Sequence, residues 1–182
     1  MNKDISFTKS SSFWKQTKRC KLVSPTLLQD DGGISDNAAM RENRQTKRSC
    51  ASSVEKSKSL KEEGIFLAEN NNLNEAIMRW SEAIAITPND ERLFEMQSQV
   101  FMLMEKDFQA AQQAEKATQL KKNWWIGWQT LGRAQMNLGH IQLAVKNFSR
   151  ALHLNPLDNS LRKADLADAV KRWNSLTKEA LR

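Results

Sequence analysis

Apolar and small residues return at helical spacing through residues 53–178 of this 182-residue chain. In the clearest stretch the pattern is W-x2-L-G followed by A-x3-F-x2-A-x4-P. Within each half of the string the apolar positions fall three or four residues apart, which places them on one face of an α-helix. The pattern therefore predicts two amphipathic helices joined by a short turn. Its residues are Trp128, Leu131, Gly132, Ala144, Phe148, Ala151 and Pro156.

The same pattern occurs three times at a constant period. We expect three repeats of equal length, at residues 57–90, 91–124 and 125–158. Pro88 and Pro156 occupy the same position in the first and third repeats, so they lie two periods apart. The middle copy is degenerate, because Lys122 stands where the other two copies have proline.

Small residues mark the place where the two helices of each repeat should approach most closely. Gly64, Ser98 and Gly132 occupy the same position in the three repeats. A large side chain there would push the helices apart, and overpacking of this kind costs about 1–3 kcal/mol. We expect the facing surface to be formed by Ala76, Ala110 and Ala144.

A further apolar pattern in residues 159–178 predicts a single helix that covers the last repeat. An array of repeats needs such a terminal piece, because its last pair of helices otherwise leaves an apolar face in water. We expect the charged residues between the apolar ones, Asp165 among them, to face solvent. The stripe expected to face inward is Leu161, Ala164, Ala167, Val170 and Trp173.

Residues 1–52 show no sustained apolar period and contain Pro25 and the pair Gly32-Gly33. Such a segment buries too little apolar area to offset the ordering entropy of about 1–2 kcal/mol per residue. We therefore expect a disordered tail over 1–52. Ser52 stands three residues before Glu55, a capping-box pattern, so we expect the first helix to begin near residue 53.

The net charge of +7 is concentrated in this tail. The first fifty residues hold ten Lys and Arg against five acids, or +5 (10 − 5), which leaves +2 (7 − 5) for the rest. Phe13-Trp14-Lys15 lies close to Lys18-Arg19, and such a basic and aromatic segment is typical of a docking motif or a nuclear or organelle address. The alternative is a plain solvated tail.

The spacing and the residues at it resemble the tetratricopeptide repeat (TPR) family. The resemblance implies an all-α fold: a right-handed superhelical stack of three helix–turn–helix hairpins plus a C-terminal capping helix, over residues 53–178. It also implies a non-catalytic adaptor or scaffold that binds proteins. In proteins similar to this one, the first helices of successive hairpins line a concave groove through their second, fifth, ninth and twelfth positions. Here the candidate groove residues are Lys58, Lys61, Ile65, Arg92, Glu95, Gln99, Met102, Ile126, Gln129, Arg133 and Met136.

The composition of this groove suggests its ligand. Arg92 and Arg133 can each hold a carboxylate with two hydrogen bonds, and Met102 adapts to irregular apolar surfaces. We expect a peptide or helix with acidic and hydrophobic residues. The alternative is that these are solvated residues, and that the protein binds through its convex side, its tail or the Trp124/Trp125 surface.

Co-chaperone repeats that bind the C-terminal carboxylate of heat-shock chaperones resemble one another in a Lys, Asn, Asn, Lys, Arg clamp. Of the matching positions in this chain only Lys61 carries the clamp residue. The resemblance therefore implies that the carboxylate clamp is absent. The five positions are Lys61, Ile65, Met96, Ile126 and Thr130.

Two other classes of function are less compatible with the sequence. An enzyme is not expected, because His140 and His153 have no evident triad partner and no phosphate loop or metal motif is present. We expect no cofactor and no metal. An RNA-associated helical-repeat protein is the stronger alternative, since Trp124 and Trp125 lie beside Lys121 and could stack on bases. The near-neutral charge after residue 50 makes nucleic acid an unlikely partner.

The compartment is expected to be inside the cell. The longest unbroken apolar run, Val100–Met104, is far shorter than the ~20 residues that a bilayer span needs. Residues 1–29 contain no secretory apolar segment, and Cys20 and Cys50 are isolated, as free thiols in a reducing compartment are. We expect a cytoplasmic or nuclear protein without a membrane partner, and nothing in the sequence indicates an obligate oligomer.

Overall fold

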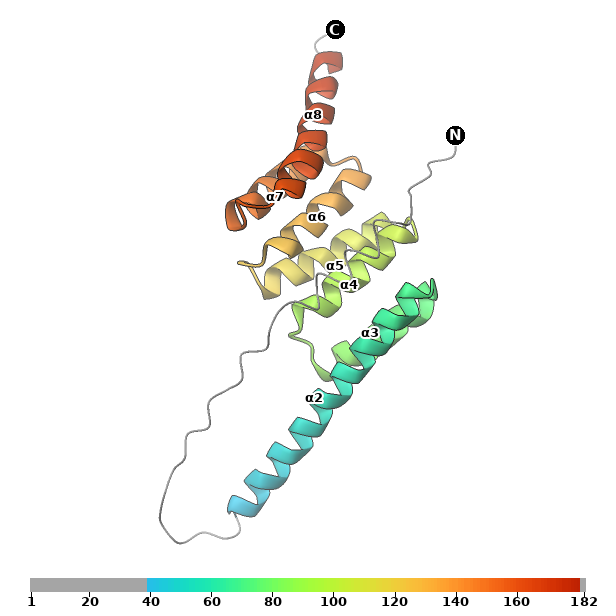
Figure 1. Cartoon of the computed structure of the whole chain (residues 1–182), viewed down its shortest axis with the longest axis vertical. Helices are drawn as coiled ribbons and strands as arrows, with labels where there is room; N and C mark the ends of the chain where they lie inside the picture. Colours follow the sequence, from blue (N-terminus) through green and yellow to red (C-terminus); the bar gives the residue numbers. More distant parts are fainter. Residues whose placement is uncertain (1–38, 181–182) are drawn as a thin grey trace. The chain divides into compact units, whose positions relative to one another are not determined.

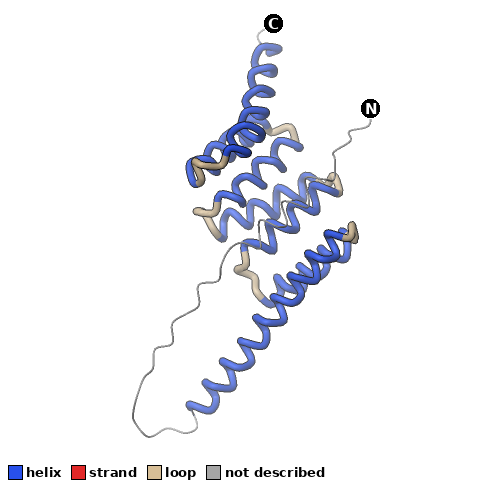
Figure 2. The backbone as a smooth tube through the Cα atoms, viewed as in Figure 1, coloured by secondary structure: helices blue, strands red, loops and turns tan. Residues whose placement is uncertain are grey.

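The computed structural model describes the backbone of residues 39–180 and the side chains of residues 52–179. Contacts divide the chain into two units, Met1–Glu55 and Lys56–Arg182. The second unit contains all the elements considered below, apart from residues 39–55 at the start of the first helix. Residues 39–180 hold helices and short connections and no strand (Figure 2), which confirms the predicted all-α class.

Seven α-helices and one π-helical segment make up the described chain. Within Lys56–Arg182 the hairpins follow one another in chain order: α3 packs on α4, α5 on α6, and α7 on the terminal helices (Figure 1). Residues 91–124 and 125–158 each contain one helix pair, whereas residues 57–90 contain the C-terminal part of α2 together with α3. The elements are α2 (Ala39–Glu69), α3 (Leu73–Ile86), α4 (Glu91–Leu103), α5 (Asp107–Leu120), α6 (Trp125–Asn137), α7 (Ile141–Leu154), η3 (Leu161–Leu166) and α8 (Ala167–Ala180).

The predicted start of the first helix was wrong. α2 begins at Ala39, so Ser52 and Glu55 lie inside the helix and do not form a capping box at its end. The segment between Ala39 and Ser52 is rich in Ala, Met, Arg, Glu, Gln and Lys and has no Gly or Pro, so no residue there stops a helix. Residues 1–38 of the predicted tail lie outside the described residues.

The turn inside each hairpin has the same backbone conformation. Asn71, Glu105 and Gly139, which occupy the same position in the three repeats, have positive φ angles of 63°, 59° and 80°. In each turn the next residue donates a backbone hydrogen bond of 2.9 Å to a carbonyl five residues earlier, the closure typical of a helix that ends in a left-handed residue. The repeat period therefore extends from the apolar pattern to the backbone angles.

The predicted close approach of the two helices has a specific cause in the first and third repeats. A Cβ at Gly64 would lie 2.3 Å from the Trp80 ring nitrogen, and one at Gly132 would lie 2.6 Å from a Phe148 ring carbon. Both rings are fully buried. The glycines therefore make room for aromatic rings of the second helix.

The degenerate middle repeat uses a different pair at the same two positions. Ser98 replaces the glycine, and Ala114 replaces the aromatic ring. Both residues are fully buried, and the Ser98 hydroxyl donates a 2.8 Å hydrogen bond to the carbonyl of Ala110. Ala114 on α5 is smaller than the ring it replaces, and this leaves room for Ser98 on α4, which is larger than the glycine it replaces.

The terminal helix departs from the prediction in its inward face. Ala164, Ala167 and Val170 are exposed, and the residues buried against α7 are Leu161 and Ala169. An α-helix turns about 100° per residue, so a stripe with three-residue steps drifts around the helix by about 60° per step. The π-helical segment η3 shifts the register further. The inward-facing cluster is formed by Ala144, Phe148, Ala151, Leu161 and Ala169.

Asp158 determines where this terminal piece begins. Its carboxylate accepts hydrogen bonds from the backbone N–H groups of Ser160 (2.9 Å) and Leu161 (3.0 Å). Asp90, at the same position two repeats earlier, caps α4 in the same way through the N–H of Arg92 at 3.0 Å. The two Pro-x-Asp segments that the sequence aligns therefore have the same role at two helix starts.

Candidate functional site

The candidate groove residues lie on α2, α4 and α6. This set is called the concave row here, after the groove that the sequence predicts. Their exposure divides them into two groups. Glu95 and Gln129 are buried, with 1% and 3% of their surface exposed, so they cannot meet a ligand in this structure. The exposed or half-buried members are Lys58, Lys61, Ile65, Arg92, Gln99, Met102, Ile126, Arg133 and Met136.

Lys61 is already paired within the chain. Its ammonium lies 2.6 Å from a carboxylate oxygen of Asp90, and both side chains are about three-quarters covered, with 23% and 26% exposed. Asp90 thus ties the first repeat to the second while it caps α4. A ligand that used Lys61 would have to compete with this ion pair.

Arg133 holds a carboxylate that comes from the terminal helix. Its Nε and Nη2 atoms donate to the two carboxylate oxygens of Asp165 at 3.0 and 2.8 Å. Gln129 donates a further hydrogen bond to the same group. The expectation that Asp165 faces water was wrong, because η3 turns it toward α6.

Gln129 and Arg133 of the third repeat are therefore engaged by the protein itself. Met136 also packs against the cluster of α7 and the terminal helices. The sequence contained one signal for this arrangement. Asp165 lies 32 positions after Arg133, which is close to one repeat length, so an acid of the terminal segment follows an arginine of α6. Spacing alone does not tell which face of a terminal helix carries it.

A buried carboxyl lies at the centre of the concave row. Glu95 accepts a 2.9 Å hydrogen bond from the Thr130 hydroxyl and another from the Gln99 amide. Burial raises the pKa of Glu95 from its ordinary 4.5 to about 7, and these hydrogen bonds together with the charges of Arg133 and Arg92 oppose that rise. Glu95 therefore joins α4 to α6 through its hydrogen bond with Thr130.

The remaining accessible part of the row is cationic and apolar. The Arg92 guanidinium is half-buried and makes no hydrogen bond or ion pair among residues 52–179, although its charge acts on Glu95. Lys58 is exposed. The half-buried apolar members of the row are Ile65, Met102 and Ile126.

The tryptophans that a base-stacking surface would need are engaged within the protein. Trp125 and Trp128 pack against the inward-facing cluster. The Trp128 ring nitrogen donates a 2.8 Å hydrogen bond to the Lys122 carbonyl, and the Arg150 guanidinium lies 4.1 Å from its ring centre. Trp124 is half-buried with the Lys121 ammonium 5.9 Å from its ring centre.

His140 and His153 are both exposed, His140 at the start of α7 and His153 near its end. The described residues contain no group of three or more His, Cys, Asp and Glu side chains that could hold a metal ion. Within residues 39–180 every helix is too short or too polar to cross a membrane.

Comparison with known proteins gives relatives that match 63–64% of this chain. No family model matches. Tetratricopeptide repeat protein 33 of Homo sapiens is 50% identical over 114 residues, which are 63% of this chain and 44% of that protein. The Mus musculus protein of the same name is 46% identical over 117 residues, 64% of this chain and 45% of that protein. The chain therefore matches less than half the length of these relatives.

A solved structure agrees with the fold. The first TPR domain of Spaghetti (RPAP3), bound to the HSP90 peptide SRMEEVD, superposes with a TM-score of 0.63 at 20% identity and covers 66% of this chain and 94% of that one. The hairpin geometry and the constant repeat period agree with this likeness. The chain is similar to tetratricopeptide repeat protein 33, and its described part has the tetratricopeptide repeat fold.

Proposed function

We propose that this chain is a non-catalytic adaptor whose concave row binds a peptide or helix carrying acidic and hydrophobic residues. The observation that carries the proposal is the bidentate bond between Arg133 and Asp165, at 3.0 and 2.8 Å. In this bond an arginine of the row already holds one carboxylate. Arg92, in the same row, has no such partner among the described residues.

The ligand's acidic residue pairs with Arg92 in this proposal, because a guanidinium offers two parallel donors that match a carboxylate. Its apolar residues contact Ile65, Met102 and Ile126, which lie along the same row. Methionine suits such a contact, since its flexible side chain adapts to the shape it meets. Lys58 adds positive charge that attracts an acidic segment.

We further propose that the chain does not bind chaperone tails by a carboxylate clamp. Two of the five clamp positions are closed by burial, since Met96 and Thr130 are 3% and 2% exposed. Lys61, the one clamp residue present, is paired with Asp90. The similar domain of Spaghetti has the acidic peptide SRMEEVD bound, which supports an acidic ligand on this fold without identifying the ligand of this chain.

The site of action in this proposal is the cytoplasm or the nucleus, as the two isolated cysteines suggest. An RNA ligand is not favoured, because Trp125 and Trp128 are packed within the protein.

Peptide selection tests the proposal. The full-length chain and its Arg92→Glu variant are each used to select peptides from a displayed library, and the affinities of the selected peptides are measured by fluorescence polarisation. We expect peptides rich in Asp or Glu together with Leu, Ile or Met. Their affinity should fall at least about tenfold for Arg92→Glu, equivalent to about 1.4 kcal/mol.

Lys146→Glu is the matched control, because Lys146 is an exposed cation on α7, outside the concave row. It makes the same change of charge and should leave the affinity unaltered. Selected peptides without acids, or peptides that bind wild type and Arg92→Glu equally well, would contradict the proposal.

A further inference from the structure

One face of α2 lacks a neighbour that the equivalent faces of the later repeats have. The α2 outer face is defined here by Ser59, Glu62, Phe66 and Glu69, all of which are exposed. One repeat further along the chain, the first three of these correspond to Leu93, Met96 and Val100 of α4, which are 0%, 3% and 0% exposed. In α6 the equivalent residues, Gly127, Thr130 and Ala134, are buried as well.

The reason for this difference is the order of the stack. α4 is packed on by α3 and α6 by α5, whereas no hairpin precedes α2 in the described part of this unit. Phe66 consequently has 64% of its surface in solvent. Equivalent faces therefore exist on α2, α4 and α6, and among the described residues a preceding hairpin covers those of α4 and α6 only.

The α2 outer face is acidic toward its C-terminal end. Glu62 and Glu69 flank Phe66, and the neighbouring Glu63 pairs with Arg79 of α3 at 3.1 Å. Lys61 points away from this face, to Asp90. Lys56 and Lys58 lie nearer the N-terminal end of the same helix segment.

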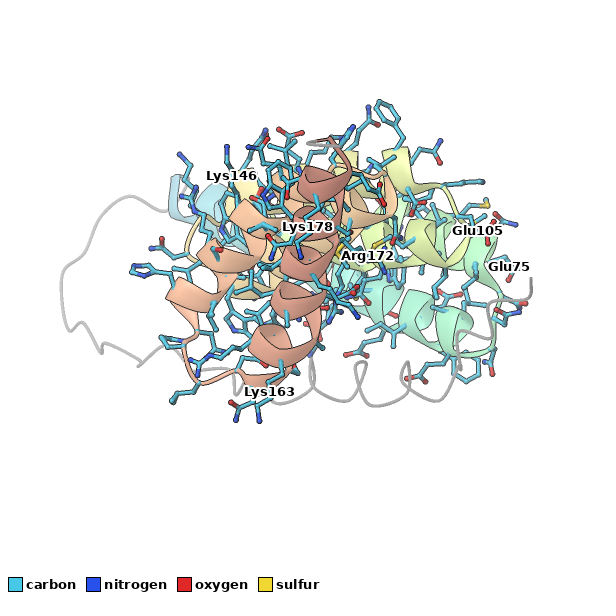
Figure 3. All side chains as sticks on the ribbon, turned by 90° about the horizontal axis from the view of Figure 1, so that it is seen from above. Glu75, Glu105, Lys146, Lys163, Arg172 and Lys178 are labelled. Carbon is cyan, nitrogen blue, oxygen red and sulfur yellow. The ribbon has the colours of Figure 1, made fainter. Side chains whose placement is uncertain are left out.

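The terminal helices, at the other end of the stack, carry a face with positive charge. The terminal helices line a surface hollow of about 680 Å³ whose side chains include three cations and no acid. Ala169, on another side of α8, is buried in the cluster with α7. Figure 3 shows Arg172 and Lys178 extending from α8. The cap outer face is defined here by Arg162, Leu166, Ala167, Val170, Lys171 and Lys178.

We propose that the cap outer face of one copy of this chain packs on the α2 outer face of a second copy. Phe66 enters the hollow beside Leu166 and Val170, where an aromatic ring leaves water. Glu62 and Glu69 lie opposite Lys171 and Lys178. The second copy then takes the place that the preceding hairpin takes at α4 and α6.

The association has two defining properties. It is head-to-tail, because the two faces differ, so copies add into a chain or close into a ring. It is also weak and sensitive to salt, because each face is small and the ion pairs lie at the surface. The expected signature is an average mass that rises with protein concentration and falls with added salt.

Sedimentation velocity of the full-length chain tests this, at concentrations from about 10 µM to about 1 mM, where weak contacts are populated. Glu62→Lys/Glu69→Lys should remain monomeric, and so should Lys171→Glu/Lys178→Glu, because each places like charges across the contact. Mixed in equal amounts, the two variants should associate again, since every contact between unlike copies pairs opposite charges. Phe66→Ala should weaken association about tenfold without unfolding the chain, because the side chain is largely exposed.

Control variants carry the same changes of charge at other exposed positions. Glu75→Lys/Glu105→Lys and Lys106→Glu/Lys146→Glu should associate as the wild type does. The proposal is overturned if the wild type stays monomeric throughout, if the mixture of the two variants fails to associate, or if the controls lose association equally. Association that persists in both charge-reversed variants would place the contact elsewhere and overturn it as well.

Discussion

The guanidinium of Arg133 grips the carboxylate of Asp165 at both oxygens, with N···O distances of 3.0 and 2.8 Å. The two residues are 32 positions apart and join the third repeat to the terminal helix. Asp165 is 14% exposed and Arg133 39%, so the pair is partly shielded from water. It closes one end of the concave row and fixes the terminal helix on the stack.

Removing either partner should loosen the terminal helix. We expect Asp165→Ala and Arg133→Ala each to lower the free energy of unfolding by about 1–2 kcal/mol, with the exposure of Arg133 limiting the value. A double-mutant cycle by urea denaturation measures the coupling between the two. Arg172→Ala serves as the control, because its ion pair with Asp168 is exposed on both sides. Additive effects of the two alanine substitutions would show that the pair does not stabilise the fold.

The glycine beneath each buried ring should not tolerate a methyl group. In Gly132→Ala the new Cβ would meet Phe148 at 2.6 Å, which outweighs the gain of about 1 kcal/mol that alanine brings to a helix. We expect a net loss of about 1–3 kcal/mol by urea denaturation. Adding Phe148→Leu should recover part of the loss that the methyl group causes, measured against Phe148→Leu alone. A stabilised Gly132→Ala variant would contradict the close approach.

Substitutions at the left-handed turn residues Glu105 and Gly139 should change the free energy of unfolding in opposite directions. Glu105 has a φ of 59°, where a side chain is strained, so Glu105→Gly should raise stability by about 1 kcal/mol. Gly139 has a φ of 80° and no atom within 4 Å of a built Cβ, so Gly139→Ala should lower stability by a similar amount through the backbone alone. Thermal and urea unfolding of both variants check this. Equal signs would show that other contacts of the two turns dominate.

Glu95 should make stability depend on pH. Burial raises its pKa to about 7 in the folded chain, so the folded state binds a proton more tightly than the unfolded state. The resulting stabilisation is complete below about pH 4.5 and is lost as the pH rises through about 7. Relative to Glu95→Gln, the wild type should lose up to about 3 kcal/mol between about pH 5 and pH 8.

Glu95→Gln is suitable for this comparison because its amide oxygen can still accept the hydrogen bond from Thr130. Urea denaturation of both proteins across the pH range gives the difference directly. Parallel stability profiles would mean that Glu95 has an ordinary pKa in the folded chain.

The chaperone peptide SRMEEVD should not bind this chain measurably. Lys61 is held by Asp90, and Met96 and Thr130 are buried, so the positions that would form a clamp are closed to a terminal carboxylate. Isothermal titration calorimetry, with a clamp-bearing TPR domain as positive control, checks the expectation. A complex with a Kd of about 1–10 µM that Lys61→Ala abolishes would overturn it.

Much of the fold could be predicted from short-range patterns in the chain. The constant repeat period, the three hairpins and the places of Gly64 and Gly132 all follow from residue types at fixed spacing, because helical faces and close approaches are local requirements. The start of α2 could not be placed, since a run of good helix formers extends the helix past a capping pattern. The inward face of the terminal helix was also misassigned. A π-helical segment has a different number of residues per turn, so it changes which side of the helix each later residue occupies.

The sequence also predicted only a part of the candidate site. Repeat spacing predicted one face for Lys61, Arg92 and Arg133, because the second, fifth and ninth positions of a first helix lie three or four residues apart and so share one side of that helix. Spacing could not show that Glu95 is buried against Thr130, 35 residues away, or that Asp165 occupies Arg133. These contacts join side chains from different hairpins, and their geometry depends on how the hairpins pack. Periodicity determines which residues face the same way, whereas the packing of one hairpin on the next decides which of them stay accessible, which are paired and how their charges behave.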